Sequence, residues 1–262
     1  MVYKSFVFCV LIISGLNLSD KNRGDAEVFA SAIQINDRST SRELTSGPDQ
    51  PDHSVWQDLL NIYVSKDGKV QYHNMVKQIG KLIKYTGYLA EYPVQTNWER
   101  SDQMAYWINA YNAFTIQMIL ENWPVKSIRD LHQGKPWDVK WIRLGNENYS
   151  LNQIENDILR PHFRDPRIHF ALNCAARSCP PLSNKAFTGD NLEIMLNSLT
   201  ENFINDQDYN QIGTKKLALS RIFDWYREDF GNLIEFINRY SDLTVSTKAE
   251  ISFNDYDWGL NQ

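Results

Sequence analysis

The sequence has no long basic run, no internal repeat and no apolar stretch long enough to span a membrane. Its 27 lysines and arginines are outnumbered by 32 aspartates and glutamates, which leaves a net charge of −5. Because nucleic-acid backbones are bound mainly by clustered cations, we expect no nucleic-acid partner. At 262 residues, with 42% hydrophobic residues and no repeat, the chain suits one large domain with a single substantial core.

The most apolar stretch, residues 5–16, follows Lys4 and is too short to cross a bilayer comfortably. This arrangement is typical of a signal peptide, which we assign to residues 1–18; a buried N-terminal strand or hairpin is the alternative. We therefore expect an exported protein, periplasmic or extracellular, with no membrane span beyond the signal. Residues 19–51 are rich in Ser, Asp, Asn, Arg and Gly and predict a flexible leader, so the folded domain is expected over residues 52–262.

Hydrophobic spacing predicts a single helix-rich α+β domain around a small β-sheet. Ser101 is the expected N-cap of the strongest helix, and residues 150–153 match a capping box. Helices are expected over residues 55–64, 75–91, 102–122, 151–159, 189–205 and 220–230. Strands are expected over residues 137–144, 168–173 and 216–219, the first two of them in the sheet, and turns over residues 66–69 and 145–146.

The helix predicted over residues 102–122 is apolar nearly all round, which indicates burial on most sides. Asn109 and Asn112 are three positions apart and therefore share one face of it. Because buried amides need hydrogen-bond partners, we expect both asparagines to meet residues 169–179.

Reactive residue types are concentrated in residues 165–182, which contain His169, Asn173, Cys174, Arg177, Ser178 and Cys179. A period of two over residues 167–174 puts His169 and Cys174 on opposite faces if the strand continues. A thiol–imidazole pair therefore requires the strand to end by Asn173. The sequence has three cysteines, and loss of the signal peptide leaves only Cys174 and Cys179; in an oxidising compartment this pair predicts a disulfide.

The residue types of a Cys-His-Asn catalytic site are all present. His169 is the candidate base for a thiol nucleophile, and Arg177 would activate that thiol by lowering its pKa. The candidate catalytic residues are Cys174, Cys179, His169 and Asn109, with Asn112 and Asn173 as further orienting amides. In the structural alternative, Cys174 is a small buried hydrophobe and His169 a hydrogen-bonded structural residue.

Two other chemistries use the same thiols. Thiol–disulfide redox is one, although reactive dithiols are normally Cys-x2-Cys at a helix start. Zinc binding is the other, with acceptable ligand types in Cys174, Cys179, His169 and His162. The zinc spacing matches no familiar module, so we expect no metal and no cofactor.

Polar and aromatic residues outside this segment complete the candidates. Glu155 and Arg160 lie on the capped helix and are expected to form an ion pair, with contact to an anionic ligand as the alternative. Five aromatic residues are expected in the core, or alternatively along a sugar or peptide groove: Trp107, Tyr111, Trp225, Tyr226 and Trp258. The histidines expected to be exposed are His53, His73 and His132.

Residues 106–113 (YWINAYNA), 123–129, 150–160, 167–182, 223–230 and 256–261 form an ordered set of motifs within residues 55–261. This set resembles family 547 of the domains of unknown function. One departure is Asn156 after Glu155, where the family usually has histidine, so a second imidazole is missing. The resemblance implies no established activity. Members occur in exported bacterial proteins and in intracellular plant and animal proteins, some beside glutaredoxin-like or DEP modules.

The predicted function is a ligand- or protein-binding module built around a His/Asn/Cys polar site, with an unidentified small molecule or protein as its partner. Its candidate ligand-binding residues are Asn112, Asn173, Arg177, Glu155 and Arg160. A thiol-dependent hydrolase or acyl-transferase acting on peptide or amide bonds is the alternative. A thiol–disulfide redox protein is the second alternative.

Overall fold

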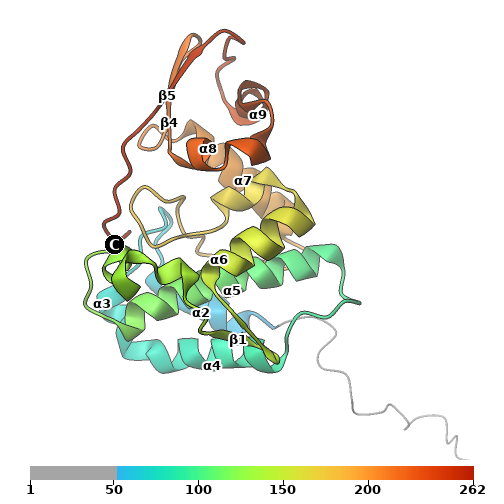
Figure 1. Ribbon diagram of the computed structural model, residues 1–262, viewed down its shortest axis with the longest axis vertical. Helices are drawn as coiled ribbons and strands as arrows, with labels where there is room; N and C mark the ends of the chain where they lie inside the picture. Colours follow the sequence, from blue (N-terminus) through green and yellow to red (C-terminus); the bar gives the residue numbers. More distant parts are fainter. Residues whose placement is uncertain (1–51) are drawn as a thin grey trace, which may run out of the picture. The chain divides into compact units, whose positions relative to one another are not determined.

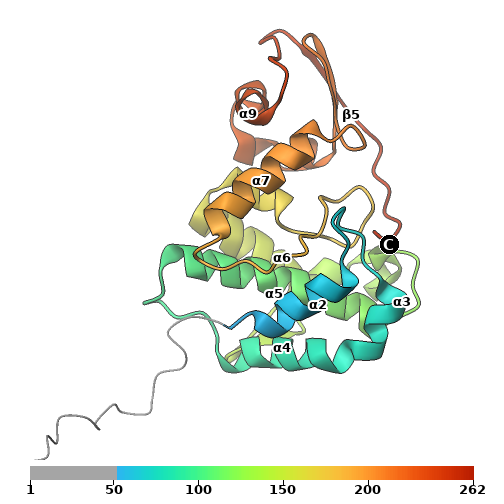
Figure 2. The ribbon, with the colours of Figure 1, turned by 180° about the vertical axis from the view of Figure 1, so that it is seen from behind.

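The computed structural model describes residues 52–262, so the predicted signal peptide and leader lie outside the described residues. Helices dominate, and the strands are short (Figures 1 and 2). The α-helices are α2 (Ser54–Tyr63), α3 (Tyr72–Met75), α4 (Ile79–Glu91), α5 (Arg100–Glu121), α6 (Leu151–Gln153), α7 (Leu192–Asn205), α8 (Ile222–Trp225) and α9 (Leu233–Tyr240). The other helical segments near the site are η4 (Pro136–Asp138), η5 (Ile154–Phe163), η6 (Pro166–Phe170) and η7 (Arg227–Phe230). Within residues 52–262, none of these helices is long and apolar enough to cross a membrane.

Helix α5 forms the centre of the larger core, as its apolar surface predicts. Nearly every residue from Asp102 to Leu120 is buried, because a helix that is hydrophobic all round must be covered on all sides. The helix begins at Arg100, and Glu99 is its N-cap, so the prediction of Ser101 as the cap was wrong. Asp102 instead accepts a hydrogen bond from the N–H of Gly189, which ties the start of α5 to the loop before α7.

The strands form two separate small sheets, not the single predicted one. Strands β1 (Ile142–Leu144) and β2 (Glu147–Tyr149) pair antiparallel across the predicted turn at residues 145–146. Strands β3 (Gln211–Ile212), β4 (Lys216–Leu219) and β5 (Glu250–Phe253) form the second sheet, in which β4 and β5 run parallel. The strand predicted over residues 137–144 is shorter than expected because its first residues lie in η4, which begins at a proline.

The strand predicted over residues 168–173 does not exist. Residues 166–170 form the 3₁₀ helix η6, which begins with Pro166 and has Asp165 as its N-cap. The Asp165 carboxylate accepts the N–H of Arg167 at 2.9 Å, so the cap and the proline together favour a helical turn. The alternation of apolar residues was real, but these local signals favour helix over strand.

The predicted capping box at residues 150–153 is confirmed. The hydroxyl of Ser150 accepts the Gln153 N–H at 3.1 Å, and the Gln153 side chain accepts the Ser150 N–H at 3.2 Å. The helix runs beyond the predicted end at residue 159, because η5 continues it with π-helical hydrogen bonding to Phe163. One face of this segment carries Glu155 and Leu159 into the interior.

Two hydrophobic clusters meet at η6. Ile168 belongs to the large cluster around α5, whereas Phe170 belongs to a smaller cluster built from α7, α8, α9 and β4. Figures 1 and 2 show α7, α8 and α9 at one end of the domain and α2, α4 and α5 at the other. His169 therefore lies between the two clusters.

The C-terminal tail returns from β5 across the domain and ends beside α3 (Figures 1 and 2). Its backbone pairs with the loop after η6: Ala176 and Leu260 form an antiparallel bridge, and Arg177 donates its N–H to Gly259 at 2.8 Å. The side chain of Asn261 accepts the Tyr72 hydroxyl at 2.7 Å. These bonds hold the tail, and the aromatic residues it carries, against residues 173–179.

Candidate functional site

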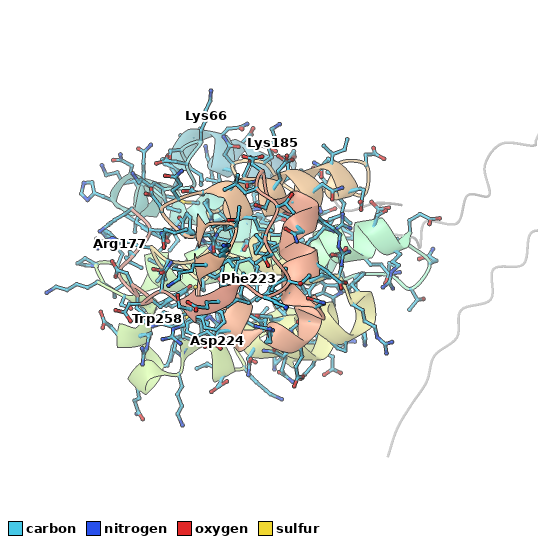
Figure 3. All side chains as sticks on the ribbon, turned by 90° about the horizontal axis from the view of Figure 1, so that it is seen from above. Lys66, Arg177, Lys185, Phe223, Asp224 and Trp258 are labelled. Atoms are coloured by element: carbon cyan, nitrogen blue, oxygen red, sulfur yellow. The ribbon has the colours of Figure 1, made fainter. Side chains whose placement is uncertain are left out.

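A cavity of about 330 Å³ lies where η4, η5, η6, α8 and the tail converge. Its lining combines aromatic rings with polar side chains from segments far apart in the sequence. The aromatic members are Tyr111, Trp137, Trp225, Tyr226, Tyr256 and Trp258, and the polar members include Lys135, Asp138, Asn152, Glu155, Asn156, His169, Cys174 and Cys179. In the view from above, Trp258 and Arg177 lie on one side of the domain and Phe223 lies nearer its centre (Figure 3).

Four of these rings form a continuous surface that we call the aromatic wall, defined as Trp137, Trp225, Tyr256 and Trp258. Trp225 stacks with Trp258 at a centroid distance of 5.8 Å and an interplanar angle of 21°. Tyr256 contacts both rings, at 4.7 Å and 4.6 Å, and Trp137 meets Trp258 edge-on at 5.6 Å. Trp225 remains 47% exposed although it packs against other aromatic rings. The wall is therefore rigid and still open to solvent.

The two cysteines lie side by side but are not bonded: both are free, so the disulfide expected from the sequence is not formed. The backbone N–H of Cys174 donates to Sγ of Cys179 at 2.9 Å. Sγ of Cys174 is hydrogen-bonded to the Tyr256 hydroxyl at 3.2 Å. Cys179 is buried, whereas Cys174 is partly exposed and lines the cavity.

The surroundings of the two thiols give them opposite acidities. Hydrogen bonds from the Cys179 thiol, the Tyr256 hydroxyl and the Ala176 N–H lower the pKa of Cys174, although burial acts in the opposite direction. Burial raises the pKa of Cys179 well above its usual value, and the neighbouring Cys174 raises it further. Cys174 is therefore the more acidic of the two thiols.

His169 is fixed in position by a carboxylate and by two aromatic rings. Its Nε2 atom lies 2.7 Å from Oδ2 of Asp229. Its ring stacks on Tyr226 at a centroid distance of 4.0 Å and contacts Phe230 at 5.6 Å. The guanidinium of Arg160 donates two hydrogen bonds to the same carboxylate, from Nε at 2.6 Å and from Nη2 at 2.9 Å. Burial alone would raise the pKa of Asp229, but the hydrogen bonds from His169 and Arg160 hold that pKa below its usual range.

Glu155 is a buried carboxylate that lines the cavity and is only 7% exposed. Burial raises the pKa of Tyr226, and the neighbouring Glu155 carboxylate raises it further. Glu155 does not pair with Arg160: the guanidinium is committed to Asp229 and, through Nη1, to Asn156 at 2.6 Å. The ion pair predicted between Glu155 and Arg160 is therefore not formed, and the acidic partner of Arg160 is Asp229.

Of the two α5 asparagines, one is hydrogen-bonded to the loop that carries Cys174 and Cys179, and the other is hydrogen-bonded to a different loop. Asn112 donates to the Ala171 carbonyl at 2.9 Å and accepts the Asn173 N–H at 2.9 Å, as expected. Asn109 instead makes both of its amide bonds to the backbone of Phe187, at 2.7 Å and 3.0 Å, so the expectation that it meets residues 169–179 was wrong. The Oδ1 atom of Asn173 accepts the N–H of Ala175 at 2.9 Å, within the same loop.

Three of the remaining candidate residues, Arg177, Trp107 and His162, do not line the cavity. Arg177 forms an exposed ion pair with Asp257 at 3.2 Å. Trp107 is buried but does not line the cavity, whereas the other four aromatic candidates do. Within residues 52–262 no group of three or more His, Cys, Asp or Glu side chains is arranged to hold a metal ion, and His162 does not line the cavity.

His73 and His132 are exposed, as predicted, but His53 is buried. Its Nδ1 atom lies 2.7 Å from the Tyr85 hydroxyl, while Nε2 has no hydrogen-bond partner. Burial lowers the pKa of His53 to about 4. The prediction of exposure was wrong because His53 immediately precedes α2 and packs against α4, a contact between segments that its polar neighbours in sequence do not reveal.

Sequence reasoning gave no site role to Asp229, Tyr256 or Trp137. Asp229 lies in a short segment with other charged residues, and nothing local distinguishes it from a surface carboxylate. Tyr256 lies in a turn-rich stretch without a regular period, and Trp137 was assigned to the strand predicted over residues 137–144. Asp229 and Tyr256 lie within two of the motif ranges, residues 223–230 and 256–261, which gave the only sequence signal for them.

The fold and the cavity define a helix-rich α+β domain with an aromatic-walled site that contains a partly exposed thiol. Residues 95–204 match the family described as protein of unknown function, DUF547. No curated protein and no solved structure matches the chain. The family match includes His169 and both cavity cysteines but ends before α8 and the tail, which supply most of the aromatic wall.

Proposed function

We propose that residues 52–262 form a ligand-binding module whose cavity takes a small amphipathic molecule. The observation that carries this proposal is the presence of two buried polar side chains, Glu155 and His169, in the lining of an aromatic cavity. A concave aromatic site with a few polar groups is typical of ligand pockets.

Rigidity of the lining supports the same proposal. Asp229 and the ring of Tyr226 fix His169, and the backbone pairing of the tail holds Tyr256 and Trp258. A site that is ordered before the ligand arrives loses less conformational entropy on binding. The cavity is therefore suited to a specific ligand, since its aromatic and polar groups keep one arrangement.

Cys174 provides a reporter of occupancy, because it is the partly exposed thiol in the cavity. We would alkylate the purified chain with N-ethylmaleimide in the presence of a library of small metabolites and map the label by mass spectrometry. A ligand in the cavity is expected to slow alkylation of Cys174, and Trp225→Ala is expected to weaken that protection. A library without a single protecting compound would contradict the proposal.

A second candidate, thiol–disulfide exchange, is favoured by the unequal pair of thiols. The partly exposed Cys174 has a lowered pKa, and the buried Cys179 next to it has a raised one. The Cys174 thiolate would attack a substrate disulfide and release one thiolate; Cys179 would then attack Sγ of Cys174, lose its proton and release the second thiol. The substrate gains two electrons, and the cysteine pair becomes a transient disulfide that an external thiol reduces.

This exchange chemistry fits the contacts better than a hydrolase does. The thiol of Cys174 is hydrogen-bonded to Tyr256, and Nε2 of His169 is committed to Asp229. With oxidised glutathione as probe, Cys179→Ser is expected to accumulate a mixed disulfide at Cys174, and the unmodified chain is not. Cys174→Ser is the control that should form no adduct. Equal accumulation in the unmodified chain would count against exchange.

A further inference from the structure

We propose that the ligand of the cavity is a neutral saccharide of one or two rings; this inference rests on the proposed ligand-binding function. The lining of the cavity combines the four rings of the aromatic wall with polar side chains from other segments. A pyranose ring has the matching character, with C–H groups on its faces and hydroxyl groups around its edge.

The geometry of the wall favours a ligand that stacks on one side only. Trp225, Tyr256 and Trp258 contact one another at centroid distances of 4.6–5.8 Å, so no slot is left between them for a flat molecule. An aromatic ligand sandwiched between rings is therefore excluded from the wall itself. A sugar ring needs only one aromatic face and leaves its hydroxyls free for hydrogen bonds on its other sides.

The polar part of the lining suits hydroxyl groups. Asn152 and Lys135 offer amide and ammonium groups, and the carboxylates of Asp138 and Glu155 accept hydrogen bonds. Asn152 and Asp138 are already joined at 3.1 Å, which places an amide and a carboxylate next to each other at the exposed rim. Neighbouring hydroxyls of a sugar can bind to such a pair with one donor and one acceptor.

The charge of the lining argues against an anionic ligand. Among the described lining residues, Asp138 and Glu155 outnumber the single lysine, Lys135. Arg160 binds Asp229 and Arg177 pairs with Asp257, whereas the Arg129 guanidinium lies over the ring of Trp258 at 5.1 Å. A phosphate or carboxylate ligand would therefore meet two carboxylates in the lining itself.

The size of the cavity limits the ligand to a small saccharide. Its volume of about 330 Å³ is at the lower end of the range for small-molecule pockets, roughly 300–1,000 Å³. Trp225 at the open edge is half-exposed, so a second sugar ring has an aromatic face on which to stack. The occupant is therefore a monosaccharide, a disaccharide or the end of a longer chain.

The test is titration of the purified chain with cellobiose, maltose, lactose and N,N′-diacetylchitobiose, followed by calorimetry and by protection of Cys174 from N-ethylmaleimide. Indole and glucose 6-phosphate serve as aromatic and anionic comparison ligands. At least one neutral saccharide is expected to bind and protect Cys174, and Trp225→Ala should weaken its binding about tenfold, the loss of one ring contact. Leu243→Ala is the matched control, because Leu243 is similarly exposed, at 49% against 47%, and does not line the cavity.

Asn152→Ala is a second variant that removes a rim amide without touching the wall, and it should also weaken saccharide binding while leaving the circular dichroism spectrum unchanged. Protection of Cys174 by indole or by the sugar phosphate, but by no neutral saccharide, would overturn the saccharide inference and leave the ligand-binding function standing. Absence of protection by any compound of the panel and the metabolite library would overturn both.

Discussion

His169 and Asp229 lie sixty positions apart in the sequence, and Nε2 of the imidazole is 2.7 Å from Oδ2 of the carboxylate. The same carboxylate binds Arg160, so one aspartate orients a histidine of the cavity and an arginine of η5. This contact joins η6, which carries His169, to η7, which carries Asp229.

Replacement of Asp229 by Asn is expected to destabilise the domain by about 2 kcal/mol, because it removes the charged acceptor of three hydrogen bonds from two partners. The pKa of Asp229 is lowered in the fold, so its contribution is present above the ordinary carboxyl pKa and is lost as the pH falls below it. Urea unfolding of the two proteins should therefore differ most near neutral pH and converge as the pH falls from about 5 to about 2. Asp224→Asn, in a more exposed ion pair with Arg221, is the control and should cost less than about 0.5 kcal/mol.

His53 is expected to make the domain less stable in mild acid. Its pKa in the fold is about 4, compared with 6.5 for an ordinary histidine, so the unfolded chain binds more protons between these values. Stability should therefore fall as the pH decreases through this range, by about 3 kcal/mol at its lower end. His53→Gln removes this titration, and the gap between the two unfolding curves should change with pH in that window. A gap that stays constant would show that burial of His53 does not control the acid response.

Cys174 is expected to react with iodoacetamide much faster than Cys179 in the folded protein. Cys179 is only 4% exposed and has a raised pKa, whereas Cys174 lines the cavity and has a lowered one. Tyr256→Phe removes the hydroxyl beside Sγ of Cys174, so the midpoint of the alkylation pH profile should move upward. Tyr240→Phe, on α9, is the control with an unchanged midpoint, and peptide mapping by mass spectrometry provides the readout. A profile unaffected by Tyr256→Phe would contradict the role of the hydroxyl.

Gly68→Ala is expected to be far more costly than Gly231→Ala. Both glycines have positive φ angles, +75° and +59°, so both substitutions carry a backbone penalty of roughly 1–2 kcal/mol or more. A Cβ atom on Gly68 would lie 2.4 Å from Cβ of Pro181, whereas nothing lies within 4 Å of a Cβ on Gly231. Thermal unfolding should therefore show a clearly larger loss for Gly68→Ala. Equal losses would mean that the turn at residues 66–69 moves away from Pro181 at little cost.

Local sequence signals identified the elements that depend on near neighbours. The length and burial of α5 followed from an apolar surface on every side, and the capping box at residues 150–153 followed from two side chains and their own backbone. Strand β4 was found at residues 216–219. The same logic failed at residues 168–173, where a capped proline start outweighed a period of two.

The candidate site was predicted only in part. Three residues of the segment 165–182, His169, Cys174 and Cys179, line one cavity, and Asn112 is hydrogen-bonded to the backbone of their loop. Asp229, Tyr256 and most of the aromatic wall were not assigned to it, because a hydrogen bond across sixty or more positions leaves no mark in either local sequence. For Asn109, helical spacing predicted a shared face with Asn112 but could not predict its hydrogen-bond partner, the backbone of Phe187.

By itself the sequence determined the helix-rich composition of the domain, its central buried helix and the residue types available for chemistry. These depend on hydrophobic spacing and on contacts within a few positions. Only the tertiary structure decided that His169 pairs with Asp229, that Cys174 and Cys179 remain free and unequal, and that the tail carries Tyr256 and Trp258 to the cavity. These outcomes depend on burial and on the meeting of distant segments, which set pKa values and cavity shape through the packing of the whole domain.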